Sequence, residues 1–214
     1  GDCSGKSPNE WREQVIQIAY DRAKKGDTEA MTVLFITKQG FKWLEMAAEA
    51  GDPLAQNTLA GIYDDGDGWF LVPGKRERTI EKWYRASAEG GYPRAMYLYA
   101  SYLFEHDGKK EDVAYWLKKS AENGYINAVG NYALSVAHIP NDLDYPKNIV
   151  EAYGLAYLMS NFKGGGTASE DGKRILPKIS EKMTTHEINQ GILFAKEWER
   201  SRPPLSYFVP VYGY

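Results

Sequence analysis

A nine-residue pattern occurs three times in the chain, at spacings of 40 and 33 residues, and constrains the fold more than any other feature. The copies are WLEMAAEAG at Trp43–Gly51, WYRASAEGG at Trp83–Gly91 and WLKKSAENG at Trp116–Gly124. Each copy begins with Trp and has Ala at its sixth position, Glu at its seventh and Gly at its ninth. Self-similarity at such a period is typical of repeat architectures, in which stacked units share one core.

The twelve residues after each of these glycines repeat as well. All three copies have Ala at the fourth and ninth positions and a large residue at the eighth and twelfth. Positions 4, 8 and 12 fall on one face of a helix, so each Gly is predicted to separate two helices. A shorter copy follows Gly26. Asp52-Pro53 and Asn148–Glu151 have the residues that begin helices, as an N-cap followed by proline and as a capping box.

These residues resemble the Sel-one-like repeat (SLR), a tetratricopeptide-related helix–loop–helix unit. The resemblance rests on Ala55-x3-Leu59-Ala60-x2-Tyr63-x2-Gly66-x-Gly68 and then on Trp83–Gly91, and it covers residues 27–163, about four units. It implies an all-α fold, a right-handed α/α solenoid of SLR units. The sequence departs from the pattern in its loops, where Ile139-Pro140-Asn141 replaces the glycines of the fourth unit.

We predict one structural domain with four consecutive parts. Residues 1–9 form a flexible N-terminal tether, and residues 10–163 form the solenoid, with a leading half-unit before about four repeats. Residues 164–200 form capping helices over Lys173–Met183 and Thr185–Arg200. Residues 201–214 form an extended tail of proline and aromatic residues. We expect this tail to pack along the last helix pair and cover its apolar end; the alternative is that it docks into a partner.

Composition excludes several classes of partner. The 26 basic and 29 acidic residues give a net charge of −3 without a basic stripe, so nucleic acid is not expected to bind. No apolar run approaches the roughly 20 residues of a membrane helix, so we expect a soluble chain. The only cysteine, Cys3, lies in a small polar stretch where a bacterial lipoprotein carries its acylated residue. Lipidation of Cys3 would be the only membrane attachment, and a free surface thiol is the alternative.

No pattern singles out a catalytic residue, a metal site or a cofactor. His106, His138 and His186 lie far apart, and Gln190 stands where a zinc-protease helix needs its second His. The loop Asp64–Trp69 lacks the ligand spacing of a calcium loop. We therefore predict that the chain is not an enzyme.

Partner contacts are predicted on the concave face of the solenoid, which the helices following each Gly mainly line. Positions 3, 6, 7, 10 and 14 after each Gly face this groove, since positions 4, 8, 9 and 12 are buried. The predicted groove residues are Arg94, Tyr97, Leu98, Ser101 and Glu105 in the third unit, Asn127, Asn131, Leu134 and His138 in the fourth, and Asn57, Thr58 and Asp65 in the second. Trp69 and Phe70 are further candidates, because the apolar run Trp69–Val72 either tucks under the solenoid or protrudes to a partner.

Resemblance to SLR proteins implies a non-catalytic module for protein–protein interaction. The family serves in bacteria as envelope scaffolds, signalling adaptors and immunity proteins, including periplasmic proteins that neutralise lipase toxins delivered by type VI secretion. A short, near-neutral chain favours an immunity protein that binds a phospholipase- or lipase-type effector in the bacterial periplasm. The alternative is a scaffold or adaptor in the cell envelope, for example in exopolysaccharide export.

Overall fold

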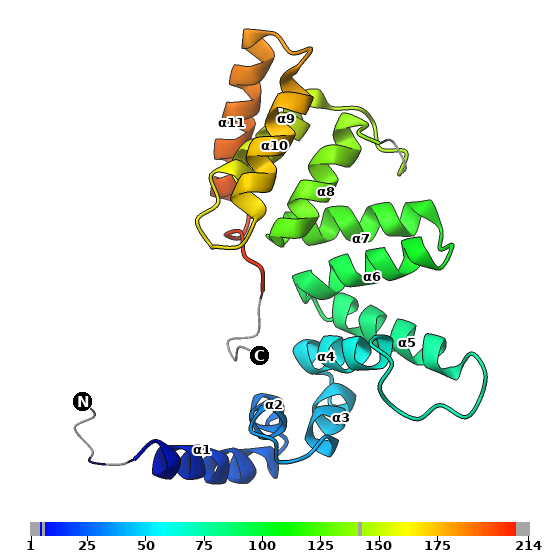
Figure 1. Ribbon diagram of the computed structural model, residues 1–214, viewed down its shortest axis with the longest axis vertical. Coiled ribbons are helices and arrows are strands. Elements are labelled where there is room, and N and C mark those ends of the chain that lie inside the picture. Colours follow the sequence, from blue (N-terminus) through cyan, green and yellow to red (C-terminus); the bar gives the residue numbers. More distant parts are fainter. Residues whose placement is uncertain (1–4, 6, 141–142, 209–214) are drawn as a thin grey trace. The chain divides into compact units, whose positions relative to one another are not determined.

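The structure is a computed structural model that describes residue 5, residues 7–140 and residues 143–208. In this part of the chain it contains eleven helices and no β-structure beyond one isolated bridge (Figure 1). The predicted all-α fold of stacked helix pairs is confirmed. The chain divides into two compact units between Tyr92 and Pro93.

The first unit holds five helices, each packed against the next along the chain. They are α1 (Pro8–Ala23), α2 (Thr28–Ile36), α3 (Lys42–Glu49), α4 (Pro53–Asp64) and α5 (Lys75–Glu89).

The second unit holds the other six helices. They are α6 (Pro93–Glu105), α7 (Lys110–Glu122), α8 (Ile126–Ala137), α9 (Ile149–Ser160), α10 (Ala168–Ser180) and α11 (Thr185–Ser201). Here α6, α7, α8 and α9 pack in chain order, and α9 also contacts both α10 and α11.

The repeated Gly and Ala positions do what the pattern predicts. Gly51, Gly91 and Gly124 follow the ends of α3, α5 and α7 with φ of 95°, 90° and 86°, a left-handed conformation that glycine adopts at little cost. The Ala residues at the fourth position, Ala55 and Ala95 among them, are fully buried. Small side chains at these contacts let neighbouring helix axes approach closely.

Local capping fixes several helix ends. Helix α1 begins at Pro8, inside the predicted tether, because Ser7 and Glu10 form a capping box. Thr184 and Glu187 form a second capping box at the start of α11.

The capping box predicted at Asn148 is half formed. The Asn148 side chain accepts a hydrogen bond from the Glu151 N–H at 3.1 Å, as predicted. The Glu151 carboxylate, however, accepts from the side chains of Asn148 and Tyr132 at 3.0 Å each.

The tail packs against more than the last helix pair. The Ser206 N–H donates to the Gly124 carbonyl at 2.9 Å and the Ile126 N–H donates to the Ser206 carbonyl at 3.0 Å, so the tail forms a short parallel bridge with the α7–α8 turn. The Tyr207 hydroxyl accepts from the Ala168 N–H at 3.1 Å. This bond occupies an N–H in the first turn of α10, which begins five residues before the predicted Lys173.

Candidate partner-binding site

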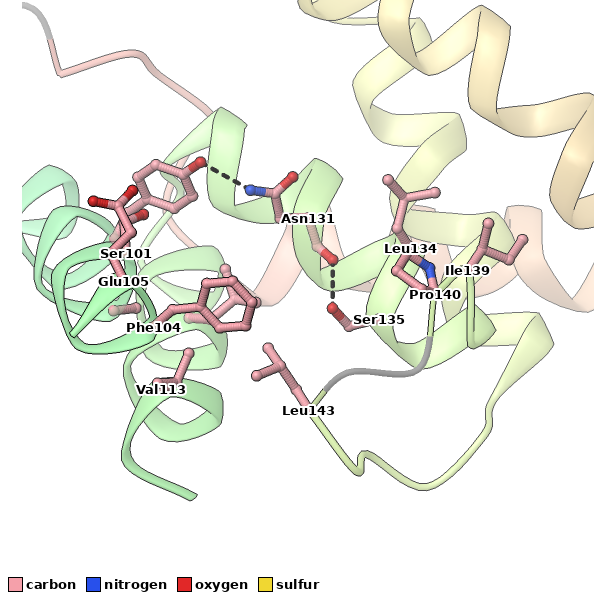
Figure 2. Close-up of a pocket in the computed structure, with 13 residues that line it drawn as sticks. Ser101, Phe104, Glu105, Val113, Asn131, Leu134, Ser135, Ile139, Pro140 and Leu143 are labelled. Atoms are coloured by element: carbon pink, nitrogen blue, oxygen red, sulfur yellow. Dashed lines mark hydrogen bonds between the residues drawn. The ribbon is translucent and has the colours of Figure 1, made fainter. Parts of the chain in front are cut away.

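A pocket of about 240 Å³ lies in the second unit, between α6, α7 and α8 (Figure 2). We call it the α6–α8 pocket. Its lining residues come from these three helices and from the segment that follows α8: Tyr97, Ala100, Ser101, Phe104, Glu105, Val113, Leu117, Asn131, Leu134, Ser135, Ile139, Pro140 and Leu143.

Apolar side chains form most of the lining. Val113 and Leu117 are buried in the core of the second unit, and Leu134 and Ile139 pack against that core. Phe104 remains 57% exposed, although it is large and apolar. Figure 2 shows Phe104, Val113 and Leu143 pointing towards one another. Exposed apolar surface beside a concave lining is typical of a binding site.

Polar groups from α6 and α8 form the rest of the lining. The Asn131 side-chain N–H donates to the Tyr97 hydroxyl oxygen at 2.8 Å, and the Ser135 hydroxyl donates to the Asn131 backbone carbonyl at 2.9 Å (Figure 2). Glu105 is the one acidic side chain of the lining. Exposed polar atoms therefore lie next to the apolar lining.

Tyr97 of the lining packs against Tyr125, which is buried at the start of α8. The rings of Tyr97 and Tyr125 lie 5.3 Å apart, and the Asn127 side-chain N–H donates to the Tyr125 hydroxyl at 3.2 Å. Burial raises the pKa of Tyr125 above its ordinary value, and the charge of Arg94 partly opposes that shift. Arg94 and Asn127 therefore lie around this tyrosine pair.

The structure brings five of the predicted groove residues together in the α6–α8 pocket: Tyr97, Ser101, Glu105, Asn131 and Leu134. Arg94 and Asn127 lie beside them, and Leu98 is half-buried on α6.

His138, another predicted groove residue, does not line the α6–α8 pocket. It ends α8 with φ of 59°, and its Nε2 lies 2.7 Å from the Tyr145 carbonyl, to which this nitrogen donates. The Tyr145 hydroxyl in turn donates to the Ala114 carbonyl of α7. His138 and Tyr145 thus fix the segment after α8, which supplies one side of the pocket.

The prediction for Asn57 is also corrected. Asn57 is only 7% exposed, and its Oδ1 is buried with no hydrogen-bond partner in the part of the chain that the structure describes. Helix α4 packs against both α3 and α5, which widens its buried arc beyond the predicted positions. Thr58 is half-buried with its hydroxyl bonded to the Leu54 carbonyl at 2.8 Å, and Asp65 is exposed just after α4.

The apolar run after α4 protrudes into solvent. Trp69 is 91% exposed and Leu71 is 83% exposed, whereas Phe70 packs edge-on against Tyr63 at 5.1 Å between ring centres. The Arg76 guanidinium donates to three carbonyl oxygens of the loop, those of Tyr63, Asp67 and Gly68, at 2.7–2.9 Å. Trp69 and Leu71 are therefore exposed on a loop that Arg76 holds in place, whereas Phe70 packs against α4.

The groove pattern missed part of the pocket. It considered only the helices that follow each Gly, and so it omitted Val113 and Leu117 of α7. It also omitted Phe104, which lies one turn beyond Ser101 on the same face of α6 and was detectable as a large apolar residue at i+3. Leu143 lies in the segment that departs from the repeat, where no pattern applied.

Two other features, a metal site and a membrane-spanning helix, are absent from the described residues. None of them forms a group of three or more His, Cys, Asp or Glu side chains placed to hold a metal ion. No helix in residues 7–140 or 143–208 has the length and apolar character needed to cross a membrane. Cys3, the predicted lipidation site, lies outside the described residues.

No protein-family model and no curated protein matches the sequence. Solved structures do match the fold. A protective antigen of uropathogenic Escherichia coli with an SLR fold superposes with a TM-score of 0.69 at 18% identity, over 94% of this chain and 43% of that one. A Sel1 repeat protein from Oxalobacter formigenes superposes with a TM-score of 0.52 at 19% identity, over 78% of this chain and 64% of that one.

The chain has the SLR fold. It spans less than half of the E. coli antigen and less than two thirds of the O. formigenes protein. The SLR fold accounts for the regular placement of Gly51, Gly91 and Gly124 and for the buried Ala positions that follow them. It does not by itself identify a partner, because function depends on the particular surface.

Proposed function

We propose that this chain is a non-catalytic protein-binding module that holds its partner on the face of α6 and α8 around the α6–α8 pocket. The observation that carries the proposal is the pocket itself, which combines apolar lining with exposed polar atoms and includes five residues of the predicted groove. Tyr97, beside the second tyrosine Tyr125, belongs to the residue types enriched in binding hot spots.

As a finer proposal, the partner is a phospholipase- or lipase-type effector, and the chain is its immunity protein in the bacterial periplasm. The resemblance to SLR proteins supports this, because that family includes such immunity proteins. The geometry of the pocket is compatible with it, since an immunity protein needs one rigid surface to cover a toxin and no chemistry of its own. In this proposal an acylated Cys3 would hold the protein at a membrane.

The test is calorimetric titration of the purified chain with the product of the adjacent gene, alongside an assay of that product's lipase activity. One-to-one binding that abolishes the activity supports an immunity protein. A neighbour that is a transport or polymer-assembly component, and that binds without any hydrolase activity, contradicts immunity and favours the envelope scaffold. Absence of binding to a neighbour that is an active lipase contradicts the immunity proposal outright.

A further inference from the structure

We propose that the α6–α8 pocket is selective for an apolar group joined to a cation, presented by a partner segment in which a large apolar side chain lies next to a lysine or arginine. This inference rests on the proposed function, because it assumes that a protein occupies the pocket. It specifies the chemistry of the segment that enters.

The side chains that line the pocket favour an apolar group. Phe104, Leu134 and Leu143 come from three different segments and line one space of about 240 Å³. Van der Waals contact with these side chains, and release of the water that covers them, both favour an apolar group. A space of this size suits a side chain of the leucine or phenylalanine class, not a whole helix.

The charge of Glu105, beside the apolar lining, favours a cation next to that apolar group. Glu105 is exposed and forms no ion pair among the described residues. The nearby lysine that begins α7, Lys110, is paired instead with Asp144 at 3.9 Å.

Asn131 adds to the acceptor character of the lining. One N–H of its side-chain amide donates to the Tyr97 hydroxyl, and its Oδ1 is an acceptor. Ser101 contributes a further hydroxyl. Glu105 carries the one charge in the lining and no basic side chain lies there, so positive charge is the complementary chemistry.

A matched pair of small probes tests this chemistry without the partner. The pair is 4-phenylbutylamine and 4-phenylbutyrate, which share an apolar body and differ in the sign of their charge. Each is titrated into the full chain at low ionic strength, and methyl NMR shifts of Val113, Leu117, Leu134 and Ile139 are followed. Ser101→Phe fills the pocket, Glu105→Gln removes its charge, and Glu199→Gln on α11 is the matched control.

The amine is expected to shift these methyl signals saturably and to bind about fivefold more tightly than the acid, the effect of one exposed charge. Glu105→Gln brings the two affinities to within about twofold, Ser101→Phe abolishes both, and Glu199→Gln changes neither. The proposal is overturned if the acid binds as tightly as the amine, if the shifts lie outside the pocket, or if neither probe binds at about 10 mM, within the range for small fragments.

Failure of this inference and failure of the proposed function are distinguishable. Probes that do not bind, together with a partner that loses affinity when the face of α6 and α8 is altered, reject the apolar–cationic selectivity and leave the protein-binding function. Probes that bind as expected, together with a partner that is insensitive to changes on this face, reject the proposed function and leave the pocket selectivity.

Discussion

Two serines at the same position of the repeat donate hydrogen bonds from one helix to the start of another. The Ser87 hydroxyl donates to the Pro53 carbonyl at 2.5 Å, and the Ser120 hydroxyl donates to the Pro93 carbonyl at 2.7 Å. Both serines are fully buried. Because these carbonyls lie at the first turns of α4 and α6, each bond fixes how one helix meets its neighbour inside a unit.

Ser120→Ala is therefore expected to destabilise the protein by about 1 kcal/mol, the net contribution of one hydrogen bond, because the Pro93 carbonyl keeps only its bond within α6. Urea denaturation measures the change. Ser201→Ala is the control, since this exposed hydroxyl bonds only within its own helix, to the Glu197 carbonyl. A Ser120→Ala variant as stable as Ser201→Ala would contradict the role given to the buried bond.

Glu187 shows how a cap makes the end of a helix sensitive to pH. The Thr184 N–H and hydroxyl both donate to its carboxylate at 2.8 Å, and the backbone bond is the larger cause that holds its pKa below the ordinary value. A carboxyl group whose pKa is lower in the folded state adds stability above its unfolded pKa. That contribution is lost as the pH falls through the folded pKa. The first turn of α11 should therefore fray in acid.

Thr184→Ala removes the hydroxyl and is expected to raise the pKa of Glu187 towards its ordinary value. An NMR titration of the side-chain carboxyl carbon measures it. Glu10 is the internal reference, because Ser7 lowers its pKa in the same way at the start of α1 and is untouched by the substitution. An unchanged Glu187 pKa would show that the hydroxyl does not contribute.

At the scale of elements, the α7–α8 turn and the tail depend on each other. Gly124 has a positive φ like Gly51, but a Cβ at Gly124 would lie 2.7 Å from the Pro204 carbonyl oxygen. A Cβ at Gly51 would meet nothing within 4 Å. The tail therefore needs a glycine at position 124 for close approach as well as for backbone conformation.

Gly51→Ala is expected to cost about 1–2 kcal/mol, the strain of a left-handed alanine. Gly124→Ala is expected to cost more and to release the tail, because Ser206 can no longer approach the turn. Amide exchange of the Ser206 N–H, which should accelerate only in Gly124→Ala, measures the release. Equal costs for the two variants and a protected Ser206 would contradict the docking of the tail.

The loop after α4 is expected to depend on Arg76 for its conformation. Arg76→Met removes three hydrogen bonds to loop carbonyls, so proteolysis and amide exchange around Trp69 should accelerate while the melting temperature changes little. Arg85→Met is the control, because the one ion pair that Arg85 makes in the described part of the chain, with Glu89, is exposed. A loop equally protected in both variants would argue against the role of Arg76.

The helix pairs were predictable because their signals are local. Gly51 and Thr184 act through their own backbone and the next few residues, so sequence alone identifies them. The start of α10 was not predictable, because its first turn is completed by Tyr207, 39 residues away. Leu117 lines the pocket although it lies on α7, which precedes Gly124, and the groove was expected mainly on the helices that follow each Gly. His138 stands at position 14 after Gly124, as the groove pattern requires, but its ring bonds to the Tyr145 carbonyl.

At the scale of the whole molecule, each unit contributes a different kind of surface. The first unit presents the loop after α4, which Arg76 holds and on which Trp69 and Leu71 are exposed. The second unit presents the α6–α8 pocket. A partner's apolar side chain entering the pocket and the exposed Trp69 entering a partner are separate contacts. We assign partner binding to the pocket alone, because five residues of the predicted groove line it.

Calorimetric titration of the adjacent gene's product into Asn131→Arg and Asn189→Arg measures whether the partner binds on the face around the α6–α8 pocket. Both asparagines are exposed, but only Asn131 lies in the pocket lining, where an arginine blocks entry and repels a cation. We predict that Asn131→Arg weakens binding at least about tenfold and that Asn189→Arg, on α11, leaves it within about twofold of the wild type. Full affinity in Asn131→Arg would contradict the claim that this face holds the partner.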